Sequence, residues 1–580
     1  MIEVPLWLVP AAPMVLVLAL CIPVLRPCVR ALVPLAPLPA LLAALADPGP
    51  VPLRLDWLLL GTDFAVTETA APFLVFTALL WGLAGWQMMR LMAHDEHGEF
   101  VQNRTTFCFL FAMAGNLGLL IVQDMAAFYT FFAMMSLASW GLVLHGGGVA
   151  QTFAGRIYIA FAIVGEVALF AGLAIGAFAV GDLQLSSMKG ETVPLLATVL
   201  ASIGFLIKLG AVPLHLWLPV AHAAAPAPAS AVLSGAMLKA GLFGLISVLP
   251  LGQIALPEIA VAFAAMALAG LILAPILGLV QGDPKAVLAY SSIGQMSLIL
   301  LGLAAALAAP ETWPLIAPAV VFLAVHHAFA KAALFLGVPA VWATQRPAAR
   351  FAVLALMALP ALTLAGIPGT SGWLAKDALK TALGDAPEGW TIWLGAALFV
   401  ASLGTALLML RALFLLARAA YKPEIARDVA LPWFAMTALV IFGLAIADIT
   451  PDAANATTVA DLLPFATAGV LAALFGMVFH TAGLRLEPAA PGELLGFVRG
   501  ASRPELALKL MSPNPARTLY IRRPAAFGRR PAAALLRPER GAFAILGIVV
   551  GLALLMVLTP APAQLVPSLP EVVRQNWTAC

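Results

Sequence analysis

The sequence predicts an all-α polytopic membrane protein with about 16 transmembrane helices, and three observations lead to this fold class. The chain has 580 residues, of which 63% are hydrophobic. Only 10% are charged, whereas about 25% would be usual for a soluble protein. Apolar runs of about 20 residues recur from one end to the other, and each is long enough to cross a bilayer core.

The sixteen candidate spans are placed by these apolar runs. They lie near residues 5–23, 31–46, 70–89, 105–122, 125–145, 157–180, 194–213, 228–250, 257–280, 286–309, 314–343, 351–379, 390–410, 431–447, 462–482 and 541–560. The span at 31–46 is short and rich in proline. The first span follows Glu3 with no basic residue before it, so we interpret it as a membrane helix rather than a cleaved signal peptide.

Basic residues are distributed unevenly between the two sides of the predicted membrane. Four of the 31 Lys and Arg residues lie inside spans; with an outside N-terminus, 23 of the others fall on one side and four on the other. Without the segment Arg485–Arg540, the first side still has twelve Lys and Arg residues and the second side has four. Because cytoplasmic loops carry the excess of Lys and Arg, we expect an inner (cytoplasmic) membrane protein with both termini outside and an even number of spans.

The span pattern divides the chain into six parts. These are 1–100 (helices 1–3), 101–250 and 251–420 (two repeat halves), 421–482 (helices 14–15), 483–540 (a basic, proline-rich segment) and 541–580 (the last helix and tail). We expect the segment 483–540 to lie in the cytoplasm. Contact with anionic lipid is the favoured interpretation of its charge, and a docking surface for a partner subunit is the alternative.

Five ionisable side chains stand out inside the predicted spans: Glu166, Lys208, Lys239, Lys331 and Lys376. A lysine at the middle of a span costs roughly 3 kcal/mol on insertion scales, so its presence indicates a role. Buried ion pairs that only orient helices are the structural alternative. Four lysines cannot all pair with one glutamate, and chains of such groups inside a membrane are typical of proton relays.

Histidines accompany these charges. His215 and His222 follow Lys208, and His326 and His327 precede Lys331. His327 and Lys331 are four residues apart and therefore share a helix face. Histidine titrates near neutral pH and can pass a proton between its two ring nitrogens. A lone buried histidine can also be purely structural, and for His222 the two interpretations are balanced.

Two of the predicted spans contain helix breaks. One break is at Gly210 and Pro213, and the other is at Gly366 and Pro368. The two spans are an odd number of crossings apart, so they run in opposite directions. Paired interrupted helices predict two inverted five-helix repeats, spans 4–8 and 9–13, with an ion site at each break.

Several long motifs resemble the antiporter-like membrane subunits of respiratory complex I, membrane-bound hydrogenases and multisubunit cation/proton antiporters. They are "KLGAVPLHLWLPVAHAAAPAPASAVLSGAMLKAGLFG", "GDPKAVLAYSSIGQMSLILLGL", "HHAFAKAALFLGVPAV" and "IPGTSGWLAKDAL", in the order that the family shows. The resemblance covers roughly residues 50–480. The "SGAMLK" form is most similar to the hydrogenase-type members.

The resemblance implies roles for individual residues. Lys208 would be the central lysine of the seventh helix, and Lys239 would relay protons along the middle of the membrane. His326, His327 and Lys331 would continue the polar axis, and Lys376 would exchange a proton with the far side. Asp377 is a candidate counter-ion for Lys376. No cofactor is implied in this subunit, so redox chemistry would occur in partner membrane subunits.

One position departs from the family pattern. Ala133 stands where a fifth-helix glutamate is expected, and alanine can neither pair with Lys208 nor carry a proton. We therefore expect Glu166 to substitute from the neighbouring helix, the alternative being an altered first half of the channel.

The leading functional prediction is a proton-translocating subunit of an energy-converting complex. The alternatives are a cation/proton antiporter module or the membrane partner of an ion-driven bicarbonate uptake system, with Na⁺ as the other candidate ion, and a structural spacer that has lost pumping. The four cysteines form no Cys-x-x-Cys motif, so no metal or iron–sulfur site is indicated. Neither a catalytic redox site nor nucleic-acid binding is expected.

Overall fold

The computed structural model describes residues 5–46, 53–94, 97–190, 193–387, 389–446 and 459–481. Its helices are α1 (Leu8–Leu20), α2 (Arg26–Leu32), α3 (Leu38–Leu45), α4 (Ala70–Ala93), α5 (Gly98–Gly118), α6 (Met125–Val143), α7 (Val149–Val180), α8 (Leu195–Leu209), α9 (Trp217–Ala224), α10 (Ala227–Val232), α11 (Leu238–Val248), α12 (Pro257–Leu279), α13 (Pro284–Ala308), α14 (Trp313–Trp342), α15 (Pro347–Ala365), α16 (Ser371–Ala382), α17 (Thr391–Arg418), α18 (Ala430–Ile446) and α19 (Val459–Thr481). The basic segment 483–540 and the predicted span 541–560 lie outside the described residues.

The prediction of a mostly helical membrane protein is confirmed. Within the described residues, ten helical segments are long and apolar enough to cross a membrane. They coincide with ten of the sixteen predicted spans, from Pro23–Leu45, which contains α2 and α3, to Trp393–Arg418 in α17.

The other six predicted spans are not among these ten, for reasons that the structure makes clear in three cases. Helix α1 has only 13 residues. Helix α8 has only 15 residues because it stops at Gly210, which adopts a left-handed conformation with φ of 77°. Helix α5 is long enough, but the polar run Gln102–Arg104 near its start lowers its apolar character.

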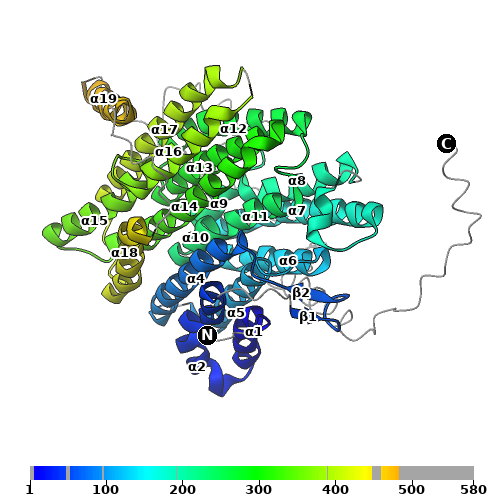
Figure 1. Cartoon of the computed structure of the whole chain (residues 1–580). Helices are drawn as coiled ribbons and strands as arrows, with labels where there is room; N and C mark the ends of the chain where they lie inside the picture. Colours follow the sequence, from blue (N-terminus) through cyan, green and yellow to red (C-terminus); the bar gives the residue numbers. More distant parts are fainter. Residues whose placement is uncertain are drawn as a thin grey trace, which may run out of the picture.

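The two halves of the chain lie side by side (Figure 1). Helices α9, α10 and α11 occupy the middle of this view, with α7 and α8 towards one side and α13 and α14 towards the other. Direct packing agrees with this arrangement: α9 contacts both α7 and α13, α11 contacts α8, and α10 contacts α14. The segment around the first helix break therefore lies between the two halves.

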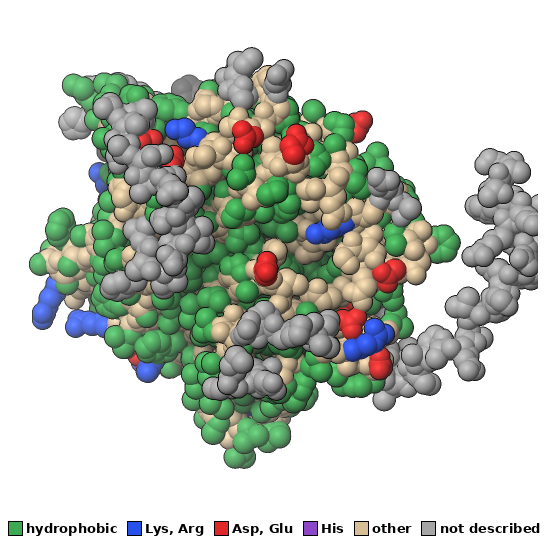
Figure 2. Space-filling view, viewed as in Figure 1, with side chains coloured by type: hydrophobic (Ala, Val, Ile, Leu, Met, Phe, Trp, Pro, Cys, Tyr) green, Lys and Arg blue, Asp and Glu red, His purple; other side chains and the backbone are tan. Residues whose placement is uncertain are grey.

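The helices present apolar side chains outward and polar side chains inward. Most of the surface seen in Figure 2 is hydrophobic. On α7, Val164, Val167 and Phe170 are exposed, whereas Glu166 on the same helix is buried. A helix with this distribution suits lipid on its outer face and protein on its inner face.

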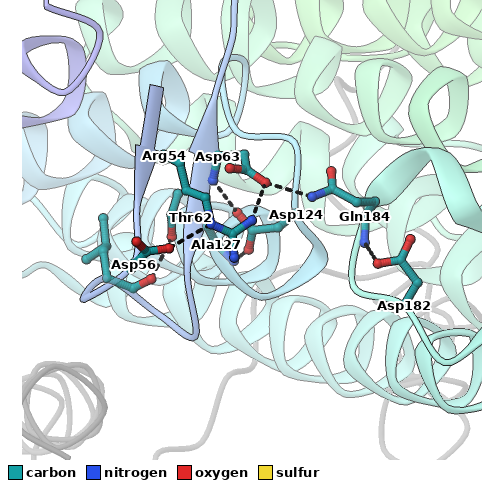
Figure 3. A network of polar contacts seen from close by, with 9 residues as sticks. Arg54, Asp56, Thr62, Asp63, Asp124, Ala127, Asp182 and Gln184 are labelled. Atoms are coloured by element: carbon teal, nitrogen blue, oxygen red, sulfur yellow. Dashed lines mark hydrogen bonds and ion pairs between the residues drawn. The ribbon is translucent and has the colours of Figure 1, made fainter. Parts of the chain in front are cut away.

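One small sheet departs from the all-α prediction. Strands β1 (Leu53–Leu55) and β2 (Thr62–Phe64) form an antiparallel pair in which Arg54 faces Asp63. The Asp63 carboxylate also accepts a hydrogen bond of 2.7 Å from Gln184 Nε2, as Figure 3 shows. Backbone hydrogen bonds join Asp63 to Gln123 and join Gln123 to Leu185. The hairpin, the α5–α6 connection and the α7–α8 connection therefore lie on one face of the molecule.

Asp124 caps the start of α6 inside this network. Its Oδ1 accepts a hydrogen bond of 2.7 Å from the Ala127 backbone N–H, and its Oδ2 accepts a longer one of 3.4 Å from Asp63 N–H. The side chain is buried. Burial is the main cause that raises the pKa of Asp124 from 3.8 to about 6, and the hydrogen bonds oppose the rise.

We predict that this carboxyl makes the stability of the protein depend on pH. Its folded pKa lies above its unfolded pKa, so the folded state retains the proton between about pH 4 and 6 while the unfolded state loses it. Stability therefore falls as the pH rises through this window, by at most about 3 kcal/mol. Thermal unfolding in detergent at pH 4.5 and 7 should show the fall. Asp124→Asn keeps a capping side chain without titrating and should reduce it; an unchanged slope would contradict the assignment.

Candidate functional site

Among the described residues, the lysines inside the helical core form no ion pair with a carboxylate. All four ion pairs found among the described residues lie at helix ends or in connections, and none includes Lys208, Lys239, Lys331 or Lys376. The first three of these lysines are buried. Each of the four instead donates hydrogen bonds to hydroxyl groups, carbonyl oxygens or an imidazole, which are partners that also suit a neutral amine.

Lys208 lies in the last turn of α8, against α6 and α7. Its Nζ donates to Ser136 Oγ at 2.7 Å and to Tyr158 OH at 3.2 Å. The Tyr158 hydroxyl donates in turn to the Ser136 carbonyl oxygen at 2.8 Å. The Lys208 ammonium also lies 5.8 Å from the centroid of the Phe132 ring. Two neutral hydroxyls and an aromatic face thus surround this lysine.

Glu166 projects from α7 into the same small space. Lys208, Ser136 and Glu166 all line one cavity of about 10 Å³, which is room for about one water molecule. Glu166 Oε2 is buried without a hydrogen-bond partner among the described residues. The carboxylate is not within the 4.0 Å limit of an ion pair with Lys208. The cavity therefore brings the two groups together without direct contact.

Ala133 lies on α6 and is buried. It is one helical turn before Ser136, whose hydroxyl accepts the Lys208 hydrogen bond. A serine hydroxyl thus lies beside Lys208, near the position where the family resemblance leads one to expect a carboxylate.

Lys239 and His327 meet at the junction between the two halves. Lys239 Nζ lies 2.5 Å from His327 Nδ1 and 2.7 Å from the carbonyl oxygen of Ser234. The lysine and the imidazole are therefore direct hydrogen-bond partners. Ser234 belongs to the π-helix η4 (Leu233–Met237), a wide turn between α10 and α11, and such turns are frequent at functional sites.

Lys331 continues this group on α14. Its Nζ donates to the Leu288 carbonyl oxygen at 2.5 Å and to the Ser291 hydroxyl, both on α13. Ser292, the next residue on α13, shares a hydrogen bond of 2.8 Å with Ser234. The surroundings of Lys239 and Lys331 are therefore connected through hydroxyl groups.

His326 and Lys376 lie at the second helix break. His326 Nδ1 is 3.1 Å from Ser371 Oγ, in the first turn of α16. Lys376 Nζ donates to the Ala365 carbonyl oxygen at 2.6 Å, at the C-terminus of α15. A helix C-terminus carries unpaired carbonyl groups and a partial negative charge, which favours a cation there.

The two breaks have the same backbone hydrogen-bond pattern. Gly210 N–H donates to Leu206 and Ile207, and the following residue also donates to Leu206; Gly366 and its successor repeat this pattern with Leu362 and Thr363. Both glycines have positive φ. The predicted interruptions near Pro213 and Pro368 therefore fall between α8 and α9 and between α15 and α16.

We predict that Gly372→Ala disrupts the second break. A Cβ at this position would lie 1.8 Å from the Thr363 carbonyl oxygen and 2.9 Å from His326 Nε2, so the backbone must move. The expected loss of stability is about 3 kcal/mol or more, seen as a lower thermal midpoint in detergent. Gly384→Ala is the control, because nothing lies within 4 Å of its added Cβ. Equal midpoints for the two variants would show that the break adapts.

The remaining predicted residues are placed as follows. His215 and His222 are buried, and neither ring nitrogen of His222 has a hydrogen-bond partner among the described residues. The His222 ring stacks on Phe335 with centroids 4.8 Å apart. Within the described part of the chain, no ion pair joins Lys376 to Asp377, and no three His, Cys, Asp or Glu residues could hold a metal ion.

Sequence reasoning missed the hydroxyl partners of the lysines. Those that accept from a lysine are Ser136, Tyr158 and Ser291, whereas Ser234 Oγ bonds to Ser292 and Ser371 Oγ bonds to His326. Sequence reasoning also missed another buried lysine, Lys285, which donates to the Ala225 carbonyl oxygen at 2.7 Å. Tyrosine occurs only five times in the chain, so a tyrosine inside a span was a usable signal. Serines gave none, because most serines in membrane helices bond to their own backbone.

Comparison with known sequences identifies related proteins. Residues 122–404 match the family model described as "NADH:quinone oxidoreductase/Mrp antiporter, TM". Hydrogenase-4 component B of Escherichia coli K12 is 33% identical over 241 residues, 40% of this chain and 36% of that protein. NAD(P)H-quinone oxidoreductase chain 4 2 of Thermosynechococcus vestitus is 32% identical over 261 residues, 42% and 46% of the two chains. The chain thus spans about a third to a half of the length of these curated relatives.

Comparison with solved structures shows the same fold. A chain of the membrane-bound sulfane sulfur reductase, an archaeal respiratory membrane complex, aligns with a TM-score of 0.61 at 19% identity, over 76% of this chain and 94% of that chain. A chain of the Mrp complex from Dietzia sp. DQ12-45-1b aligns with a TM-score of 0.58 at 21% identity, over 80% and 92%. Both structures are complexes by name, and the first is named as a membrane complex.

Proposed function

Because residues 122–404 belong to the NADH:quinone oxidoreductase/Mrp antiporter family, we propose that this chain is a proton-translocating, antiporter-like subunit of an energy-converting membrane complex. One observation carries the proposal. Four lysines lie in the helical core, and among the described residues each is bonded to hydroxyl, carbonyl or imidazole partners rather than to a carboxylate. Such partners let a lysine gain and lose a proton without breaking an ion pair.

The proposed path has two parts. Lys208 and Glu166 exchange a proton through the cavity beside Ser136. Lys239, His327 and Lys331 form the second part, and His326 leads from it to Lys376 at the second break. His215 and His222 lie near the first break and are proposed to assist transfer from the inner side. Asp377 is proposed to be a counter-ion of Lys376 that acts without a direct ion pair.

We propose the finer architecture on the same basis. Sixteen spans form two inverted five-helix repeats, spans 4–8 and 9–13, within the parts 101–250 and 251–420. The matching hydrogen bonds at Gly210 and Gly366 support the repeat. The parts 1–100, 421–482 and 541–580 add the outer helices.

The proposed orientation places both termini outside the inner membrane and the segment 483–540 in the cytoplasm. The predicted spans place the hairpin, the α5–α6 connection and the α7–α8 connection on the same side of the membrane. Hydrogen bonds between these three segments support that placement. On the opposite side, Arg26 pairs with Glu99 and Arg90 pairs with Asp428. Anionic lipid is the proposed contact of the basic segment.

Other membrane subunits are the proposed partners, because the structures with the same fold come from membrane complexes. A cation/proton antiporter module, with Na⁺ as the second ion, is the second candidate function. It is favoured by a putative antiporter subunit, mnhA2, of Staphylococcus haemolyticus, 29% identical over 325 residues, 51% of this chain and 40% of that protein. A spacer without pumping is disfavoured by the four lysines that the helical core retains, Lys208, Lys239, Lys331 and Lys376.

One experiment separates these functions. The tagged full chain is purified with its native partners and reconstituted into vesicles, and proton movement is measured with and without Na⁺. Proton movement driven by electron transfer and independent of Na⁺ is expected. Proton movement that requires a Na⁺ gradient would support the antiporter module, and none in a complex with active electron transfer would support the spacer.

A further inference from the structure

A large cavity opens between α4, α14 and α18, separate from the small cavity at Lys208. Its volume is about 610 Å³, within the range of roughly 300–1,000 Å³ that ligand pockets have. Its walls are mainly apolar, with Val75 and Leu79 on α4, Val321 and Val325 on α14 and Leu439 on α18. Membrane-embedded walls of this kind suit a hydrocarbon chain.

The mouth of the cavity carries one charge of each sign. Glu68 lies just before α4, and Lys189 ends the short helix η3 (Leu185–Lys189). Among the described residues, no ion pair within 4.0 Å includes either side chain. Lys189 is half-buried, and burial lowers its pKa. An anion beside Lys189 would offset that cost, and a cation would suit Glu68.

The length of the cavity fits one leaflet of a bilayer. Trp313 lines it at the start of α14 and His326 lines it farther along the same helix. The thirteen-residue separation corresponds to roughly 20 Å of helix, and half of a bilayer core is about 15 Å. A tryptophan at the polar end also matches the aromatic belt at a membrane interface.

From these features we propose that the cavity binds one phospholipid with a zwitterionic phosphate–ammonium headgroup. The phosphate lies against Lys189, the ammonium lies against Glu68, and one acyl chain runs along α4 and α14 towards His326.

At its inner end, the cavity reaches His326 and the second helix break, so a bound lipid would affect both. His326 Nε2 is buried without a hydrogen-bond partner among the described residues, and both His326 and Ser371 line the cavity. An acyl chain in this space excludes water from the histidine and from the second helix break. The lipid therefore isolates this part of the polar core from the membrane surface.

The test is direct binding of a defined lipid to the full-length chain. The protein is purified in detergent, stripped of lipid and titrated with palmitoyl-oleoyl phosphatidylethanolamine, with binding measured by native mass spectrometry. Lys189→Glu and Glu68→Lys are each expected to weaken binding roughly five-fold, the factor for one charge near a membrane surface. The double exchange restores the opposite-charge pair and is expected to recover most of the affinity.

Two further variants make the test specific. Lys380→Glu changes an exposed lysine that does not line the cavity, and its affinity should equal that of the wild type. Ala317→Phe fills the cavity wall and should abolish binding while leaving the mouth unchanged. Equal affinity of the wild type, Lys189→Glu and Ala317→Phe would overturn the proposal. Phe329 also lines the cavity, so bound lipid should protect its ring from oxidative labelling by water-derived radicals. An unchanged extent of labelling of Phe329 on addition of the lipid would likewise overturn the proposal.

Discussion

Lys208→Ala is expected to reduce proton uptake roughly a hundred-fold or more, and Glu166→Gln is expected to reduce it as severely. A positioned proton donor or acceptor contributes a factor of this size. Among the described residues, Lys208 donates hydrogen bonds to the hydroxyls of Ser136 and Tyr158 and forms no ion pair. Glu166 lines the same cavity, so it is the carboxylate that can exchange a proton with Lys208 through one water molecule. Initial rates of vesicle acidification, normalised to inserted protein, measure both effects.

The control for this pair is Lys380→Ala, which removes an exposed lysine outside the cavity and should leave the rate unchanged. Ser136→Ala should give a smaller loss than either variant, because it removes a partner of Lys208 and no titrating group. Near-normal uptake by Glu166→Gln would show that the carboxylate does not replace the one absent at Ala133. Lys208 would then act with its hydroxyl partners alone.

Lys239→Met is expected to abolish proton translocation while keeping or raising the thermal midpoint. The methionine removes the nitrogen that is hydrogen-bonded to His327, so the junction between the halves loses its proposed transfer step. Replacing a buried charge by an apolar side chain of similar volume is often neutral or stabilising. Proton uptake and thermal unfolding of the same preparation separate the two effects.

Gln295→Met is a matched control for removing a buried polar side chain. Gln295 donates to Thr405 at 2.9 Å on α17 and carries no titratable proton. Its variant should lose some stability and keep translocation. Uptake by Lys239→Met at the level of Gln295→Met would remove Lys239 from the path, and a midpoint far below that of the wild type would show that the lysine supports the fold.

Much of the fold could be predicted because membrane helices can be identified in a sequence by their length and hydropathy. The interruptions at Gly210 and Gly366 were predictable as well, since glycine and proline inside an apolar run leave few other conformations. The hairpin Leu53–Phe64 was not. Its strands have three residues each, and they contact connections far along the chain, at Asp124, 61 residues from Asp63, and at Gln184, 121 residues from it. Within the described residues ten segments meet the length and hydropathy of a membrane span, and α8 is not one of them because it ends after 15 residues.

The charged side chains of the candidate site could be predicted because burying them costs much free energy, whereas its serines could not because burying them costs little. A lysine or glutamate inside an apolar run demands an explanation, which is why Lys208 and Glu166 could be singled out. Ser136, Ser234 and Ser291 cost little to bury, so the sequence alone does not distinguish them from serines bonded to their own helix. Their role depends on which helices face each other, and that is a property of packing.

The π-helix Leu233–Met237 sets the rotational register of everything that follows it. A wide turn holds one residue more than an α-helical turn, and each residue rotates a helix by about 100°. Deleting a single residue within this turn would let α10 run into α11 as a regular helix. Lys239 would then point about a quarter turn away from His327, even though the sequence of α11 itself would be unchanged. The contact between the two halves thus depends on the number of residues in one turn as much as on the identity of the lysine.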